Sequence, residues 1–173
     1  MTRMPGPAEI VSAARDAAFD KPLITNVFRA VIAEAIVAMA LPQWRWASVD
    51  YASCDFVHPD GRRLEVKQSA ARQSWSTGKP SRASWDIAPR TGHWTEDARW
   101  IPEPGRNADI YVLCHHPVFG DDADHRNPAQ WKFYAIRAAS LPDTKSLSLA
   151  GAERLAEPVG FLDLSSAVEL CSR

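Results

Sequence analysis

Apolar residues recur at helical spacing between Asn26 and Leu41. They are Phe28, Ile32, Ala35, Ile36 and Met39. This period predicts a helix that buries one stripe against a core. Thr25 or Asn26 suits its N-cap, and Pro42 ends it.

Glu34 is the only charged residue between Arg29 and Arg45. An ionised carboxylate on so apolar a helix is costly unless it has a partner. Glu34 therefore lies either at the wet edge of the helix or in a site that holds other charges.

Apolar and polar residues alternate on both sides of the turn-forming sequence Pro59-Asp60-Gly61. This pattern predicts a β-hairpin with its loop centred on Asp60. The paired residues would be His58 with Arg62, Phe56 with Leu64, and Asp55 with Glu65. One face, with Cys54, Phe56, Leu64 and Val66, would belong to the core. The other would carry Asp55, Val57, Arg63, Glu65 and Lys67.

The remaining pattern alternates between strand-like and helical segments. Strands are expected over residues 44–51, 83–88, 108–116 and 131–137, and helices over residues 8–18, 69–76, 150–156 and 165–170. Residues 89–107, with two tryptophans, are expected to be irregular, and residues 120–130 to form a loop. This order predicts an α/β fold with a mixed central sheet flanked by helices. We expect one domain over residues 1–173, with a weakly structured lead-in over residues 1–22.

The composition is that of an ordinary globular protein, with 46% hydrophobic and 24% charged residues. Cys54, Cys114 and Cys171 lie far apart, which favours a reducing cytoplasm over a disulfide framework. The apolar stretch 31–41 is too short to cross a bilayer, which takes about 20 residues. No signal peptide and no membrane association are expected.

The net charge of −1 conceals a basic segment. Residues 62–106 carry nine Lys or Arg against five Asp or Glu. Arg72, Lys79 and Arg82 belong to this segment and are candidates to hold a phosphate backbone. A solvated basic face is the alternative.

The expected pairing of Asp55 with Glu65 brings two carboxylates together beside Lys67. Like charges directly opposite each other on paired strands are destabilising. A hard cation such as Mg²⁺ would neutralise them, since it takes carboxylate and phosphate oxygens. The hairpin therefore suggests a phosphodiester site. The alternatives are an ordinary half-exposed hairpin, or a bulge that would point the two acids apart.

The order of these motifs resembles the restriction-endonuclease-like, PD-(D/E)XK, phosphodiesterase superfamily. The motifs are Glu34, Asp55, Glu65-Val66-Lys67 and the strand 108–116. The run from Glu65 to Trp75, followed by residues 108–114 and 131–134, is most similar to a largely uncharacterised bacterial group within it. Cys54 stands where many members have proline before the aspartate.

The resemblance implies an αβββαβ core and a site built on Asp55 and Glu65. These residues would hold Mg²⁺, with Mn²⁺ as a substitute, and the Val66 carbonyl would complete the metal shell. Lys67 would position water or stabilise developing charge, and Glu34 would assist the metal through water or orient a basic group. Gln68 and Gln73 would contact substrate, or serve in helix packing or solubility. The implied activity is a DNA endonuclease of restriction or repair type, working as a homodimer.

Two other interpretations remain open. A nuclease-fold protein without catalysis would bind nucleic acid or a partner. A transition-metal site would use Cys114 and His116 with Asp121 or His125, because His115 points to the opposite face of its strand.

Overall fold

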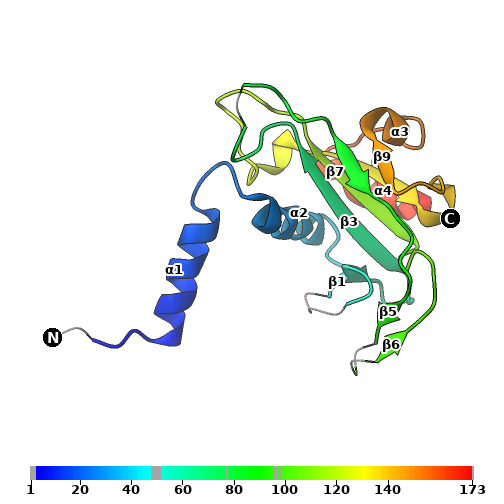
Figure 1. The fold of residues 1–173 in the computed structure, drawn as a ribbon, viewed down its shortest axis with the longest axis horizontal. Helices are drawn as coiled ribbons and strands as arrows, with labels where there is room; N and C mark the ends of the chain where they lie inside the picture. Colours follow the sequence, from blue (N-terminus) through cyan, green and yellow to red (C-terminus); the bar gives the residue numbers. More distant parts are fainter. Residues whose placement is uncertain (1–2, 48–51, 77, 96, 98, 173) are drawn as a thin grey trace.

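A computed structural model describes residues 3–47, 52–76, 78–95, 97 and 99–172. Its centre is a five-stranded sheet in the order β1-β2-β3-β7-β8 (Figure 1). The strands are β1 (Arg45–Trp46), β2 (Phe56–Val57), β3 (Arg63–Ala70), β7 (Ile110–His116) and β8 (Lys132–Arg137). β3 and β7 pair in parallel and the other neighbours are antiparallel. The prediction of a mixed α/β fold is therefore confirmed.

Helices lie on both sides of this sheet: α2 (Asn26–Ala40), α3 (Leu149–Glu153) and α4 (Leu164–Cys171). A further helix is α1 (Pro7–Phe19). α2 packs on β3, and α4 packs on β8. The opposite face carries α3 and a small sheet of β4 (Ser84–Asp86) and β9 (Ser146–Ser148). α1 extends away from the body and has no buried residue (Figure 1).

Each face of the central sheet covers a separate core. Leu64, Val66 and Val112 point toward α2 and α4. Tyr111 and Leu113 point the other way, where they pack with Trp85 of β4. The expected core face of the hairpin is confirmed for Phe56, Leu64 and Val66, which lie in the core under α2. Cys54, which was expected beside Leu64, lies instead in the second core, because it precedes β2 and does not follow that strand's alternation.

The predicted hairpin has the expected register between Phe56 and Leu64, but the expected pairing of Asp55 with Glu65 does not form, because the Asp55 amide bonds Leu64 instead. Phe56 pairs with Leu64 and Val57 with Arg63. The Asp55 amide donates to the Leu64 carbonyl at 3.1 Å, and the His58 amide donates to the Arg62 carbonyl at 2.8 Å. Gly61 has φ of 93°, which the turn requires and which glycine adopts without strain.

Three local expectations are wrong. No helix forms over residues 69–76, because pairing with β7 extends β3 to Ala70 and a turn follows. No helix lies between Ala70 and Ile110 in the described residues, unlike the αβββαβ order. Phe28 and Met39 are exposed, since α2 buries the stripe Arg29, Ala33, Ile36 and Val37. β1 covers two residues of the strand expected over residues 44–51, of which residues 48–51 lie outside the described part.

The segment expected to be irregular contains a hairpin of its own. β5 (His93–Trp94) pairs with β6 (Trp100–Ile101) as a separate two-stranded sheet. In Figure 1 it lies at the end of the central sheet near β1. None of the helices in the described residues combines the length and apolar character that crossing a bilayer would need.

Candidate active site

The candidate site lies where β3 continues beyond the end of its pairing with β2. β2 ends its pairing near Asp55, whereas β3 continues to Ala70. The Val66 amide is the next group along this open edge, and it donates to Asp55 Oδ2 at 2.6 Å. A strand residue directs its amide and its carbonyl to the same side. The Val66 carbonyl therefore opens toward Asp55 as well.

Glu65 and Lys67 lie two residues apart on one face of β3, and their side chains form an ion pair. Both are largely buried. Glu34 reaches the same region from α2, where its Oε2 accepts a hydrogen bond from Trp46 Nε1 at 2.9 Å. Of the two positions expected for Glu34, the structure shows the one among other charges. Glu34, Asp55, Glu65 and Lys67 are called the acidic centre below.

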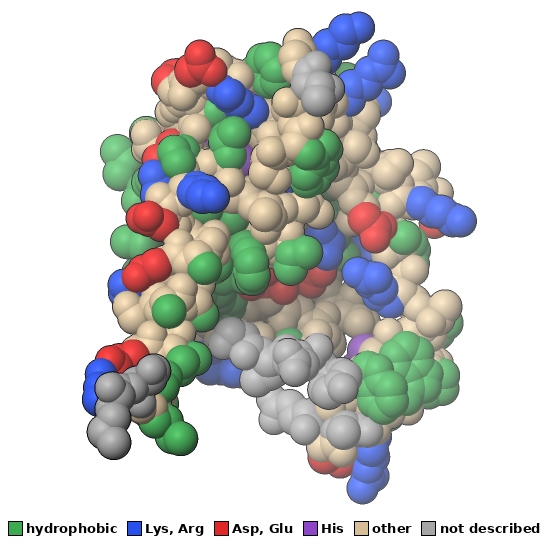
Figure 2. Space-filling model, turned by 60° about the vertical axis from the view of Figure 1, so that its left-hand side comes forward, with side chains coloured by type: hydrophobic (Ala, Val, Ile, Leu, Met, Phe, Trp, Pro, Cys, Tyr) green, Lys and Arg blue, Asp and Glu red, His purple; other side chains and the backbone are tan. Residues whose placement is uncertain are grey.

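A pocket of about 280 Å³ opens over Glu34, Asp55 and Lys67 of the acidic centre, while Glu65 is not part of its lining. Its lining comes from α2, β3, β4 and the segment before β2: Ala30, Glu34, Asp55, Val66, Lys67, Gln68, Ser84, Trp85 and Asp86. Figure 2 shows a hollow with acidic side chains along its wall and Lys or Arg side chains beside it. The volume is enough for a phosphate group with its bound water.

The carboxylates of the acidic centre repel one another. Burial, followed by the Glu65 carboxylate, raises the pKa of Asp55 to about 7, although the Val66 amide and Lys67 oppose this rise. Burial also raises the pKa of Glu34, against the hydrogen bond from Trp46. The positive charge of Lys67 lowers the pKa of both Glu34 and Asp55 and so opposes these rises. The acids therefore exceed the positive charge available to them.

This donor set has the chemistry of a hard-cation site. Carboxylate oxygens and a strand carbonyl are the ligands that Mg²⁺ prefers, and a cation would offset the repulsion on Asp55. The described residues contain no group of three His, Cys, Asp or Glu side chains arranged to hold a metal ion. The fit therefore rests on Asp55, Glu65 and the Val66 carbonyl rather than on a three-side-chain cluster.

Gln68 is fixed by residues of α2 that no local pattern singles out. Its Oε1 accepts from Arg29 Nε at 2.6 Å, and its Nε2 donates to Asn26 Oδ1 at 3.1 Å. Arg29 is only 1% exposed, and burial lowers its pKa to about 10. A buried arginine on an apolar stripe looks like any other arginine in the sequence, so only the folded chain identifies it.

The other expected substrate contacts lie elsewhere. Gln73 serves the turn after β3, since its Nε2 donates to the Ala70 carbonyl at 2.8 Å. Arg72 bonds the Phe119 and Gly120 carbonyls and pairs with Asp121. Lys79 and Arg82 are exposed in the loop that follows. None of these four lines the pocket of the acidic centre.

The transition-metal alternative does not fit the structure. Cys114 is buried in the core that α2 covers, and its thiol bonds the Val112 carbonyl. Both ring nitrogens of His125 are engaged, by the Ile24 amide and the Arg72 carbonyl. His116 packs edge-on against His125, with ring centroids 4.9 Å apart. These histidines form a packed polar cluster in the interior.

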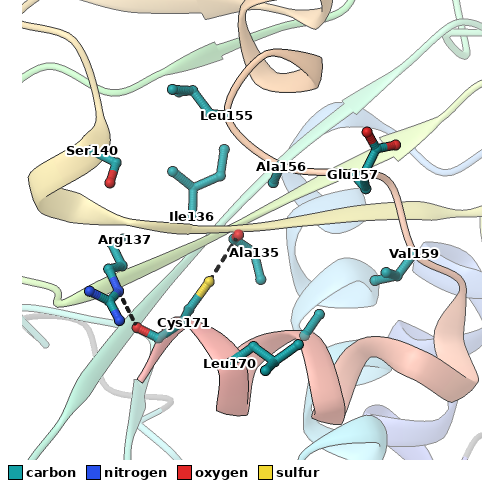
Figure 3. Close-up of a pocket in the computed structure, with 11 residues that line it drawn as sticks. Ala135, Ile136, Arg137, Ser140, Leu155, Ala156, Glu157, Val159, Leu170 and Cys171 are labelled. Atoms are coloured by element: carbon teal, nitrogen blue, oxygen red, sulfur yellow. Dashed lines mark hydrogen bonds between the residues drawn. The ribbon is translucent and has the colours of Figure 1, made fainter. Parts of the chain in front are cut away.

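A larger pocket, of about 400 Å³, lies along β8 and α4 (Figure 3). Apolar side chains dominate its lining, and Cys171 Sγ bonds the Ala135 carbonyl at 3.1 Å. Its arginine, Arg137, donates to the Cys171 carbonyl at 2.8 Å. This pocket offers no pair of carboxylates, so the acidic centre is the better candidate for chemistry.

No protein-family model matches the chain, and no curated protein sequence matches it. Among solved structures it is similar to a bacterial homing endonuclease, I-Ssp6803I, with a TM-score of 0.41 and 20% identity. The similarity covers 72% of this chain and 77% of the other. This similarity is distant, and it assigns no residue a role.

Proposed function

We propose that this protein is a Mg²⁺-dependent endonuclease that hydrolyses phosphodiester bonds in DNA, of restriction or repair type, in the PD-(D/E)XK superfamily. The observation that carries the proposal is the acidic centre itself. A half-buried aspartate, whose pKa of about 7 is raised by burial and by the Glu65 carboxylate, lies with Lys67 in a pocket at an open strand edge. Carboxylates crowded in this way without a role would cost stability with nothing in return.

In this proposal each residue has a distinct task. Asp55, Glu65 and the Val66 carbonyl would hold Mg²⁺, or Mn²⁺ in its place, which when bound supplies a nucleophilic water and neutralises phosphate charge. Lys67 would donate hydrogen bonds to the negative charge that develops on the phosphate. Glu34, held by Trp46, would accept a proton or order a water at the open edge. Gln68, oriented by Arg29 and Asn26, would donate to a phosphate oxygen.

A plasmid cleavage assay tests this proposal. Purified protein with Mg²⁺ should nick or linearise supercoiled plasmid, and chelation should abolish the cleavage. Asp55→Asn and Lys67→Met should each lower the rate by on the order of a hundred-fold or more. Asp143→Asn and Lys145→Met make the same changes at exposed positions outside the pocket and should leave the rate unchanged.

Cleavage of both strands of a duplex calls for two acidic centres, so we expect a homodimer. Sedimentation at working concentrations should give about twice the mass of the 19.2 kDa chain. If the protein is a monomer that only nicks DNA, the proposed chemistry stands and the expected homodimer is refuted. Intact plasmid at all Mg²⁺ and Mn²⁺ concentrations, with DNA still bound, would instead favour a binding module without catalysis.

A further inference from the structure

The β5–β6 hairpin, described over residues 90–95, 97 and 99–105, presents two tryptophans to solvent and is called the tryptophan hairpin below. Trp94 and Trp100 lie directly opposite each other on its two strands. Their ring centroids are 5.4 Å apart at an interplanar angle of 61°, and they are 42% and 43% exposed. Large aromatic side chains are usually much more buried. An edge-to-face pair stabilises a small hairpin, yet it does not require so much exposed indole.

Backbone packing holds the Trp100 ring in place. A Cβ atom added at Gly92 would lie 2.6 Å from a carbon of the Trp100 ring and would also meet the Ile101 carbonyl. The indole therefore rests directly against the Gly92 backbone. A ring fixed before binding loses little freedom when a ligand stacks on it.

The tryptophan hairpin lies at the end of the central sheet near β1 (Figure 1). Arg90 and Gly105 close the base of the hairpin with two backbone hydrogen bonds, of 2.7 and 2.9 Å. Tyr111 of β7 lies opposite Glu65 in the register of β3 and β7. Burial raises the pKa of Tyr111 to about 12; Glu65 adds to the rise, while Arg106 and Arg90 oppose it. The Tyr111 hydroxyl thus feels the charges of both the Glu65 carboxylate and Arg90 at the base of the hairpin.

The surface of the hairpin combines aromatic faces with an exposed arginine at its base, Arg90. A second exposed arginine, Arg99, pairs with Asp97 at 3.1 Å, and the basic excess of the segment 62–106 lies outside the hairpin. In Figure 2 hydrophobic side chains gather on a projection beside the hollow. Phosphates attract Arg90, and the π-faces of bases stack on indoles. In an intact duplex those faces are covered by neighbouring base pairs, so only unpaired bases can use both features.

We propose that the tryptophan hairpin binds unpaired bases of a DNA strand that passes over the acidic centre, with Trp94 and Trp100 as the stacking platform. This inference rests on the proposed function and names its substrate class: DNA with a single-stranded or locally unpaired stretch. Arg90 would neutralise an adjacent phosphate. The acidic centre would then cleave next to the unpaired bases.

Fluorescence anisotropy with labelled DNA tests this inference. Full-length Asp55→Asn protein without divalent cations would bind a single-stranded oligonucleotide and the matching duplex. Trp100→Leu and Trp94→Leu should each weaken binding to the single strand by on the order of ten-fold, with a smaller effect on the duplex. Trp100→Phe, which keeps a stacking ring, should retain most of the affinity. The slope of affinity against salt should stay unchanged, because no phosphate contact is removed.

Trp75→Leu is the matched control, since Trp75 is 63% exposed but lies outside the hairpin. Equal losses at Trp75 and Trp100, or tryptophan variants that bind both DNAs as the parent does, would overturn the inference. If Trp100→Leu changes the circular dichroism, DNA quenching of tryptophan emission is compared between the parent and the Trp100→Phe protein. Weaker quenching in Trp100→Phe supports stacking on Trp100, and equal quenching refutes it. Parent protein that binds no DNA would refute the proposed function as well, whereas normal plasmid cleavage by the tryptophan variants would refute the hairpin inference alone.

Discussion

Replacement of Asp55 by asparagine should stabilise the protein at pH 8 while it abolishes metal binding. The amide oxygen of the introduced asparagine can still accept the hydrogen bond that the Val66 amide gives to Asp55 Oδ2. The substitution therefore removes the negative charge and keeps the local geometry. What changes is the repulsion within the acidic centre.

The size of the effect follows from the pKa of Asp55. It lies at about 7 in the folded protein, against 3.8 for an ordinary aspartate. The folded protein thus retains a proton that the unfolded chain releases between these values. The stabilisation from this proton is complete below about pH 4 and is lost as the pH rises through 7. Three pKa units correspond to on the order of 4 kcal/mol, or about 10 °C in Tm for a chain of this length.

Thermal unfolding followed by circular dichroism at pH 5 and pH 8, with and without Mg²⁺, measures this effect. Without metal, Asp55→Asn should raise Tm at pH 8 and change it little at pH 5. Mg²⁺ at a hundred times its Kd should stabilise the parent by about 2.7 kcal/mol and so raise its Tm. The same Mg²⁺ concentration should leave the Tm of Asp55→Asn unchanged. The exposed control Asp143→Asn should behave as the parent. A lower Tm for Asp55→Asn at pH 8 would refute the reasoning, because it would mean that the charge is already compensated.

Three further outcomes follow from contacts around the acidic centre. Trp46→Phe removes the indole donor to Glu34 and should weaken Mg²⁺ affinity by on the order of ten-fold in calorimetry; unchanged affinity would remove Glu34 from the metal's surroundings. Burial, more than any other cause, lowers the pKa of His125 to about 4, so its neutral form stabilises the fold above pH 6.5 and this contribution is lost as the pH falls toward 4. In the Asp55→Asn background, His125→Gln should therefore flatten the urea-unfolding profile between pH 6.5 and 4.5 by on the order of 2 kcal/mol, and an unaltered slope would contradict this. Arg29→Met leaves the side-chain oxygen of Gln68, Oε1, without its donor and should lower the free energy of urea unfolding by about 1–3 kcal/mol. An unchanged free energy of unfolding would show that water replaces the guanidinium.

The hairpin register could be predicted because its causes are local. The alternation on each side of Pro59-Asp60-Gly61 and the turn itself fix which residues pair, and the structure has Phe56 opposite Leu64 as expected. The face of α2 could not be fixed in the same way. Its sequence is apolar nearly all round, so several stripes were compatible, and packing on β3 selected the one that contains Arg29.

The helix expected over residues 69–76 shows the limit of local patterns most clearly. Ser69 and Ala70 have no strand preference of their own, and they extend β3 because His115 and His116 of β7 pair with them from more than forty residues away. The same long-range pairing leaves the edge of β3 open beyond Asp55 and brings Glu34 of α2 to it.

The sequence by itself determined the mixed α/β class, the Phe56–Leu64 hairpin and the place of Lys67 beside Glu65, because neighbours along a strand interact whatever the rest of the chain does. Only the tertiary structure decided that Glu34 joins these residues, that Gln68 is held by a buried arginine, and that Arg72 and Gln73 serve loops instead. Those contacts join segments distant in sequence, and their free energy appears only when both cores are packed.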